Sequence, residues 1–287
     1  MNYRSRISLK MNSKGELGYF KPKSHQHVPI SQCAIAHTAI NQVLEQLPPV
    51  PFANKGIEFR SDGSKVLLNI FSAKGQRPRK KQLEDWAGDI VAGIGMDSQS
   101  MIGEKYSSIT VCGVEHHFSL GAFYQVNLEI NELLVSQIVS WVEEHAPSKV
   151  LDLYSGAGNI GLAIANKGIP VLGIESNPHA VQDGKRTALR LNLDMEFRKG
   201  NADRFQAGDA FFNLAVLDPP RKGAQSVFKE LALTRPMALI YVSCNPHALR
   251  KDLVEARKQG YLPRRMIAFD MFPHTSHVET LVELIRE

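Results

Sequence analysis

Cys244 follows a run of apolar residues and precedes Asn245 and Pro246. A thiolate is a soft nucleophile, and one at the end of a strand beside a cofactor site is suited to covalent catalysis on a ring that must first be activated. Glu279, farther along the chain, has a carboxylate that can serve as a general base. Each residue alone also has an ordinary structural explanation, as inert packing or as a strand residue. The motifs around them therefore decide their interpretation.

A glycine turn between a strand and a helix indicates a cofactor site. The segment 150–161 reads as an apolar strand, a turn containing Gly156 and Gly158, and a helix start, where backbone and free amides can approach a ligand. Many structural turns share this pattern. Glu175, which ends the next strand 19 residues after Gly156, is placed to accept hydrogen bonds from both ribose hydroxyls of an adenosine cofactor.

The form of the turn favours one adenosine cofactor. Asp152 and Asn159 belong to a D-x-x-x-G-x-G-N pattern, which suits the sulfonium and amino-acid tail of S-adenosyl-L-methionine better than a pyrophosphate. A dinucleotide enzyme remains the alternative. Asn201, after the third strand, is either an adenine-binding residue or a turn residue. Asp218, followed by two prolines, is held rigidly at the carboxyl edge of the sheet, where doubly wound folds bind ligands.

The elements that must position these residues alternate between strand and helix. After an amphipathic helix over 128–144, the pattern predicts strands and helices at 149–153, 160–166, 170–174, 178–191, 195–199, 214–217, 228–233, 238–243, 247–259, 263–270 and 279–285. This order predicts an α/β, doubly wound, mainly parallel sheet.

The first part of the chain predicts a smaller α+β domain. We expect strands over 5–11, 17–20, 57–60, 65–71 and 107–118, and helices over 34–47 and 81–94. The expected division is a basic α+β region over residues 1–118 and the α/β domain over 119–287.

Composition and charge limit the function class. The chain has 287 residues, 43% of them hydrophobic and 22% charged, as in globular proteins with a proper core. Residues 1–115 carry 15 Lys and Arg against 10 Asp and Glu, whereas residues 116–287 carry 19 of each kind. A polyanion would therefore be attracted to residues 1–115. Within them, the basic segment 77–81 is either a phosphate-binding patch or the solvated start of a helix.

Three separated cysteines fit a reducing cytoplasm. No stretch has the length and apolar character of a signal peptide or a membrane-spanning helix. We therefore expect a cytoplasmic protein with no membrane partner.

Five ordered motifs identify a resemblance. They are 121–127 (GAFYQVN), 155–159 (SGAGN), 218–223 (DPPRKG), 243–246 (SCNP) and 270–279 (DMFPHTSHVE). In this order they resemble the motifs of RNA uracil-5 C-methyltransferases, and the 23S ribosomal RNA branch looks closest. The resemblance covers nearly the whole chain and is strongest from Ser119 onward.

The resemblance implies an RNA-recognition region over 1–118, a class I, Rossmann-like methyltransferase domain over 119–287 that uses S-adenosyl-L-methionine, and a covalent reaction. The Cys244 thiolate adds to C6 of uracil, C5 then attacks the sulfonium methyl, and Glu279 removes the C5 proton. The positions that match cofactor-contacting ones are Gln125, Tyr154, Asn159, Glu175, Asn201 and Asp218. The uridine must be flipped out of a loop to be reached, and Phe123 or Tyr124 could stack near it.

The implied product is 5-methyluridine in RNA, most readily in 23S rRNA, and no DNA substrate is expected. Transfer RNA is the nearest alternative substrate, because the shared motifs concern the uracil and not its surroundings. The competing hypothesis belongs to a different functional class: an RNA-binding or RNA-remodelling factor without catalytic activity. The presence of both Cys244 and Glu279 argues against it.

One departure from the family concerns metal binding. Ribosomal members often carry an N-terminal OB-like domain and four cysteines for an iron-sulfur cluster, and in this sequence only Cys33 matches a cluster position. One thiolate cannot hold a cluster, so we expect none. Two other sets, His274 with His277 and Cys112 with the histidines at 116–117, lack a convincing four-ligand arrangement, so no metal is expected.

Overall fold

A computed structural model describes residues 1–287 except 74–76 and 207–210. The chain forms two compact units. The first consists of Met1–Ile109, His117–Gly121 and Val126–Leu128, and the second of Thr110–His116, Ala122–Gln125 and Glu129–Glu287. The boundary that we expected after residue 118 lies inside the stretch 110–128, where the chain belongs to each unit in turn.

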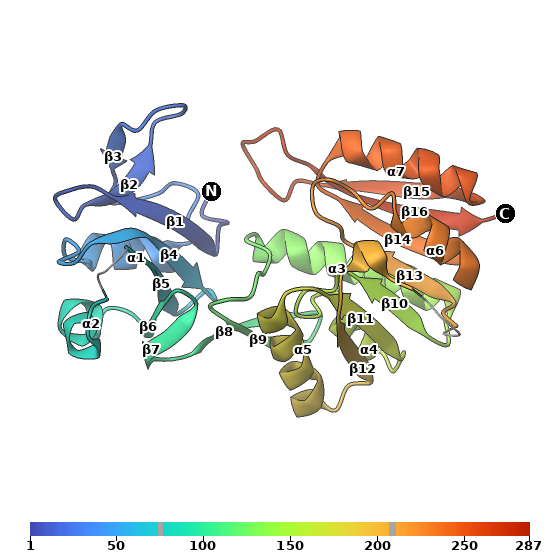
Figure 1. Ribbon diagram of the computed structural model, residues 1–287, viewed down its shortest axis with the longest axis horizontal. Helices are drawn as coiled ribbons and strands as arrows, with labels where there is room; N and C mark the ends of the chain where they lie inside the picture. The colour runs from blue at the N-terminus through green and yellow to red at the C-terminus, as the bar shows by residue number, and fades with distance from the viewer. Residues whose placement is uncertain (74–76, 207–210) are drawn as a thin grey trace. The chain divides into compact units, whose positions relative to one another are not determined.

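The first unit is built on a seven-stranded sheet with the strand order β3-β2-β1-β4-β5-β6-β7 (Figure 1). Its strands are β1 (Arg6–Met11), β2 (Leu17–Phe20), β3 (His27–Pro29), β4 (Asn54–Ser61), β5 (Val66–Ser72), β6 (Gly93–Met96) and β7 (Gln99–Gly103). The helices are α1 (Thr38–Gln46) and α2 (Lys80–Ala87). A separate hairpin pairs β8 (Tyr106–Val111) with β9 (Val114–Ser119).

The helix expected over 81–94 is wrong in its second half. Helix α2 ends at Ala87, and Gly93–Met96 form β6, which runs parallel to β5. A Cβ at Gly93 would lie 2.4 Å from the carbonyl oxygen of Glu104, so this position depends on a close backbone approach that a helical pattern does not reveal. Strands β3 and β7 were not expected either.

The second unit contains a seven-stranded sheet with the order β12-β11-β10-β13-β14-β16-β15. The strands are β10 (Val150–Leu153), β11 (Val171–Glu175), β12 (Met195–Lys199), β13 (Leu214–Leu217), β14 (Ala238–Ser243), β15 (Tyr261–Phe269) and β16 (Glu279–Arg286). The first five are parallel, and β16 is antiparallel to both β14 and β15. The predicted α/β, doubly wound, Rossmann-like class is confirmed.

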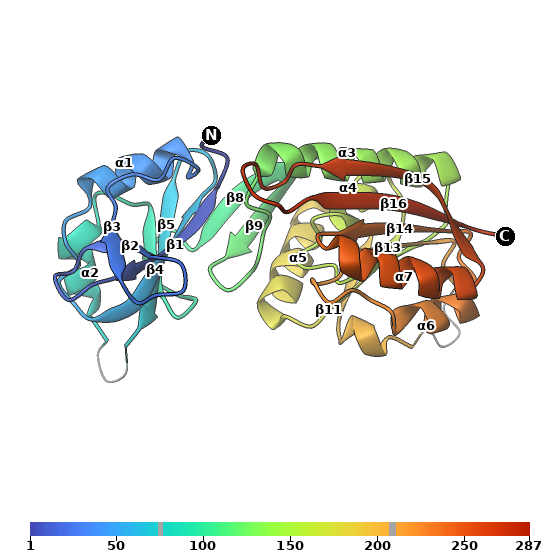
Figure 2. The same ribbon diagram turned by 90° about the horizontal axis from the view of Figure 1, so that it is seen from above.

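Helices cover both faces of this sheet. They are α3 (Leu128–His145), α4 (Gly161–Ala165), α5 (Pro178–Leu191), α6 (Val227–Thr234) and α7 (Pro246–Lys258). Helix α3 runs along one face and α6 and α7 lie on the other (Figure 2). The strand residues between the helices are almost fully buried, with Leu151, Leu217 and Tyr241 at 0% exposure, so the strand ends are held firmly in place. In the described residues, no helix is both long enough and apolar enough to cross a membrane.

Candidate functional site

The strand order of the second unit reverses between β10 and β13. At such a switch point the loops after the two strands turn to opposite faces and leave a crevice at the carboxyl edge of the sheet. Tyr154 directly follows β10, Glu175 ends β11 and Asp218 directly follows β13. The fold therefore brings these three sequence-predicted residues to one edge.

The turn after β10 has an unusual backbone. Tyr154, Gly156 and Gly158 have φ angles of +63°, +56° and +88°. A bulky residue such as Tyr154 rarely adopts this left-handed conformation, which marks the turn as strained. A Cβ at Gly158 would lie 2.7 Å from the Leu162 side chain, whereas a Cβ at Gly156 would have nothing within 4 Å. The space at Gly156 is therefore open to a ligand.

Glu175 holds this turn in place. Its Oε2 accepts a hydrogen bond from the Gly156 N–H at 3.0 Å, and its Oε1 accepts one from the Asn177 N–H at 2.6 Å. Oε1 also accepts from the Ser176 hydroxyl at 3.2 Å, whereas Oε2 has a second lone pair that can accept from a ligand hydroxyl. Glu175 can therefore shape the glycine turn and bind a ribose at the same time.

Carboxylates concentrate beside the turn. Burial, first, and then the charges of Asp218 and Glu175 raise the pKa of Asp152 well above its usual value. Its Oδ2 accepts from the Gly161 N–H at 3.1 Å, and its buried Oδ1 has no hydrogen-bond partner among the described residues. Burial raises the pKa of Asp218 to about 7. Burial and the neighbouring carboxylates disfavour ionisation of Asp152, and a cationic ligand would oppose this effect.

Two of the residues predicted to bind the cofactor form hydrogen bonds with other residues of the protein. Asn159 and Asn131 exchange a pair of side-chain hydrogen bonds, each 2.9 Å long, and Asn131 is 2% exposed. Asn201 accepts from the Asp203 N–H at 3.0 Å and caps the short helix η1 (Ala202–Arg204), so the structure displays its turn role. The remaining candidate, Gln125, is half-buried in the second unit.

A side-chain network that the sequence did not predict joins three strand ends. The Tyr154 hydroxyl donates to Asp203 Oδ1 at 2.6 Å, and the Lys222 ammonium pairs with Asp203 Oδ2. These residues follow β10, β12 and β13, respectively. Their spacing in the sequence has no pattern that would have identified the network.

Cys244 and Glu279 lie at the same edge as Asp218. Ser243 of β14 and Thr280 of β16 are register partners in an antiparallel pair, so the next pair along the strands is Cys244 and Glu279. Cys244 is half-buried and Glu279 is 5% exposed. The two sequence-predicted catalytic candidates are therefore neighbours.

Burial is the main cause of the raised pKa values of Glu279 and Cys244. Burial and then the charge of Asp218 raise the pKa of Glu279 to about 7, while Arg221 opposes the increase. Burial, then Glu279 and Asp218, raise the pKa of Cys244, and Arg221 again lowers it. With a pKa near 7, Glu279 is suited to take up and release a proton near neutral pH.

Two hydrogen bonds hold the 218–223 loop to helix α7. The Asn245 side-chain N–H donates to the Arg221 carbonyl oxygen at 2.9 Å, and the Ala224 N–H donates to Asp252 Oδ2 at 3.0 Å. Asn245 also accepts from the His247 N–H at 3.1 Å as the N-cap of α7. No sequence motif marks Asp252, which only the three-dimensional fold brings to this loop.

The other two cysteines belong to other elements of the chain. Cys33 packs in the first unit, and Cys112 lies in the β8–β9 turn, where burial and the nearby Glu132 carboxylate raise the pKa of its thiol to about 11. Across the described residues, no three His, Cys, Asp or Glu side chains gather in a metal-binding group.

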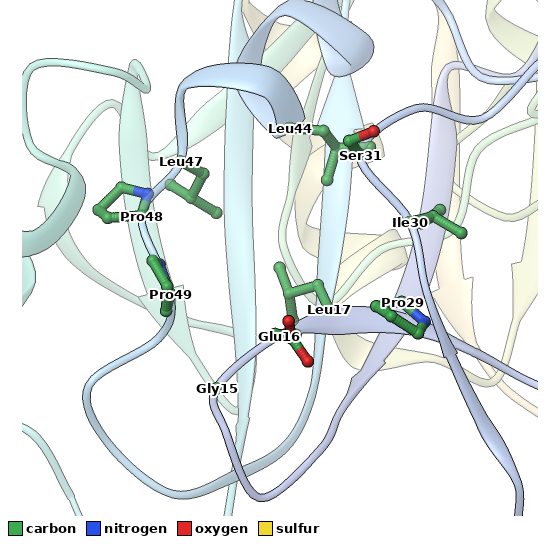
Figure 3. Close-up of a pocket in the computed structure, with 10 residues that line it drawn as sticks. All are labelled: Gly15, Glu16, Leu17, Pro29, Ile30, Ser31, Leu44, Leu47, Pro48 and Pro49. Atoms are coloured by element: carbon green, nitrogen blue, oxygen red, sulfur yellow. The ribbon is translucent and has the colours of Figure 1, made fainter.

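The first unit also contains a cavity of about 290 Å³ (Figure 3). Its lining is largely apolar, with Leu17, Pro29 and Leu44 among its members and Glu16 as its titratable residue. None of the sequence-predicted site residues lines it, so the candidate site is the strand edge of the second unit.

Comparisons with known proteins give the family of this chain. Residues 191–287 match the tRNA (Uracil-5-)-methyltransferase family model, and residues 130–235 match the methyltransferase small domain. A 23S rRNA (uracil(1939)-C(5))-methyltransferase of Aliivibrio salmonicida is 31% identical over 300 residues, covering 97% of this chain and 68% of that protein. One of Pseudomonas fluorescens is 30% identical over 302 residues, covering 97% and 66%.

The chain thus spans about two thirds of the length of these relatives. The crystal structure of Pyrococcus abyssi tRNA (uracil-54, C5)-methyltransferase with S-adenosyl-L-homocysteine superposes with a TM-score of 0.82 at 24% identity, covering 99% of this chain and 76% of that chain. The superposition establishes the shared class I methyltransferase fold. The sequence identity to the bacterial enzymes shows that the chain belongs to the RNA uracil-5 C-methyltransferase family, in its 23S ribosomal RNA branch.

Proposed function

We propose that this protein uses S-adenosyl-L-methionine to methylate C5 of a uridine in RNA, producing 5-methyluridine, and that 23S rRNA is its substrate. The observation that carries the proposal is the adjacency of Cys244 and Glu279 beside Asp218, at the carboxyl edge of a methyltransferase sheet. Transfer RNA is the alternative substrate, since the site addresses the base and not the RNA around it.

The residues of the second unit fit the cofactor. Glu175 can accept from the ribose hydroxyls, and the open space at Gly156 admits the cofactor close to the backbone. Asp152 and Asp218 supply negative charge for the ammonium and sulfonium groups. Gln125, Tyr154, Asn159 and Asn201 complete the proposed binding set. Asn159 acts through its pairing with Asn131, and Asn201 through the turn that it caps.

In the proposed mechanism, the Cys244 thiolate forms a bond to C6 of uracil, and the electron pair of the C5–C6 bond moves onto C5 and its conjugated carbonyl. The cofactor supplies an electrophilic methyl group. C5 forms the new carbon–carbon bond as the methyl–sulfur bond of the sulfonium breaks, and the electron pair of that bond stays on sulfur, which leaves S-adenosyl-L-homocysteine. Glu279 then removes the C5 proton, and the C6–sulfur bond breaks to restore the ring and return the thiolate. Burial of Glu279 keeps its proton affinity high enough for this step.

The target uridine must leave its stack to reach Cys244. Phe123 is 56% exposed and is therefore suited to stack against an unstacked base, whereas Tyr124 is 4% exposed and belongs to the core. The basic residues of the first unit are proposed to bind the flanking phosphates. We propose a cytoplasmic protein that works without an iron-sulfur cluster, and no DNA substrate.

Methyl transfer can be tested directly with labelled S-adenosyl-L-methionine and unmodified 23S rRNA or tRNA, comparing the wild type with Cys244→Ala. Labelled 5-methyluridine, identified by mass spectrometry and formed by the wild type alone, is the expected result, and the labelled RNA identifies the substrate class. Absence of product from a wild-type protein that binds the cofactor contradicts the proposal and favours an RNA-binding or RNA-remodelling role.

A further inference from the structure

We infer that Asn245 is a positioning residue whose side chain holds the Arg221 loop beside Cys244. The inference deepens the proposed function and rests on it. Asn245 directly follows the nucleophile, and its amide reaches across to the loop after β13.

The amide of Asn245 performs two tasks. Its oxygen accepts from the His247 N–H at 3.1 Å and caps α7, while its nitrogen donates to the Arg221 carbonyl at 2.9 Å. Capping alone is done equally well by serine or aspartate. Only a side chain with both a carbonyl and an NH₂ group can do both in this geometry, because aspartate lacks the donor and serine is shorter.

The far end of the loop is fixed independently. The Ala224 N–H and the Tyr241 hydroxyl both donate to Asp252 Oδ2, and Asp252 is 1% exposed. Gly223, at φ +83°, leaves no room for a side chain, because a Cβ there would lie 2.3 Å from Asp252. Loss of the Asn245 contact would therefore release the stretch around Arg221 without detaching the whole loop.

The position of Arg221 matters because three charged groups act on the thiol. Glu279 on β16 and Asp218 after β13 raise the pKa of Cys244, and Arg221 lowers it. Arg221 also lowers the pKa of Glu279. If the loop moves, the Arg221 guanidinium no longer lowers the pKa of Cys244 or of Glu279.

The variant Asn245→Ser separates the two tasks, since it keeps the cap and removes the donor to Arg221. The measurement is the pH dependence of iodoacetamide alkylation at the Cys244 peptide, followed by mass spectrometry in the full chain without RNA or cofactor. We expect the alkylation midpoint to rise by about 0.5 pH unit or more, while the melting temperature remains that of the wild type.

Arg221→Gln and the double variant provide the decisive comparison. If Asn245 acts through Arg221, Arg221→Gln raises the midpoint and the added Asn245→Ser changes it no further. The inference is overturned if the alkylation midpoint of Asn245→Ser is the same as that of the wild type. It is also overturned if the increases of the two single variants add up in the double variant.

Turnover provides a second readout. We expect kcat of Asn245→Ser to fall about two- to tenfold, with KM for S-adenosyl-L-methionine unchanged, because one neutral hydrogen bond is lost outside the cofactor site. A raised KM with unchanged kcat contradicts a positioning role at the thiol. Failure of the proposed function would give a different result. If the wild type had no methyltransferase activity, the alkylation midpoint would still differ between the wild type and Asn245→Ser.

Discussion

Glu279 stands next to Cys244 across the antiparallel strands β14 and β16, one pair beyond the register partners Ser243 and Thr280. This arrangement arises where β16 joins the edge of an otherwise parallel set of strands, so a residue at the start of one strand meets a residue at the end of another. The thiol and the carboxylate are 35 residues apart in the sequence, and only the direction of β16 makes them neighbours.

Glu279→Gln should accumulate a covalent complex with RNA. Without a base, the C5 proton stays in place and Cys244 cannot be expelled after methyl transfer. We expect turnover to fall by about 10²- to 10⁴-fold, and a slowly migrating RNA–protein band to appear on a denaturing gel. The band should be absent in Cys244→Ala. Turnover near the wild-type rate in Glu279→Gln would exclude Glu279 as the base.

Ionisation of Glu279 predicts the pH dependence of the reaction. The carboxyl must be ionised to accept a proton, and its pKa is raised to about 7. The rate at saturating substrates should therefore rise with pH through about 7 and continue to rise above it, because the Cys244 thiol must also ionise and its pKa is raised. A rate that is flat from about pH 5.5 upward would indicate that no group with this pKa takes part.

The raised pKa values of Asp218 and Glu279 predict that the folded protein loses stability as the pH rises through neutrality. Asp218 has a folded-state pKa of about 7 against a usual value of 3.8, and Glu279 about 7 against 4.5, so the folded chain binds more protons between these limits. The stabilising contribution of these two groups is therefore fully present below the usual pKa values and is lost as the pH rises through about 7. Asp218→Asn should raise the melting temperature at about pH 8 by a few degrees and weaken cofactor binding. An equal melting temperature for variant and wild type at that pH would contradict this.

The charge of the cofactor should activate the thiol. A bound sulfonium cation near Cys244 opposes the carboxylates that raise the pKa of the thiol. S-adenosyl-L-methionine should therefore lower the alkylation midpoint of Cys244, whereas S-adenosyl-L-homocysteine, which lacks the charge, should do so less. Equal effects of the two ligands, at concentrations that saturate both, would contradict a charge effect.

The Tyr154–Asp203–Lys222 network should support cofactor binding. Asp203→Ala and Tyr154→Phe each remove the 2.6 Å hydrogen bond that orients the ring, so we expect Kd for S-adenosyl-L-homocysteine to rise about three- to tenfold by calorimetry. Lys222→Met should have a smaller effect, because its side chain is 64% exposed. Glu196→Gln, which breaks the exposed pair with Arg198, is the matched control. If Asp203→Ala binds as the wild type does, the network has no role at the cofactor.

Local signals predicted the second unit well. Asn177 and Pro178 form a cap and first position that define the start of α5, and the range predicted for this helix, 178–191, agrees with the structure. The 81–94 helix was wrong, because Gly93 and Gly95 serve close packing between distant segments. The residues that act through partners, Asp203 and Asp252, could not be predicted, since their partners are far away in the sequence and meet them only in the folded sheet.

Covalent capture at Cys244 is a direct test of the proposed nucleophile. The protein is incubated with S-adenosyl-L-methionine and substrate RNA containing 5-fluorouridine, whose C5 fluorine cannot be removed as a proton, and the protein is digested for mass spectrometry. The proposed mechanism predicts a Cys244 peptide that carries the methylated fluorouridine nucleotide. Methylated RNA with no adduct on this peptide, or an adduct on Cys33 or Cys112, would contradict it.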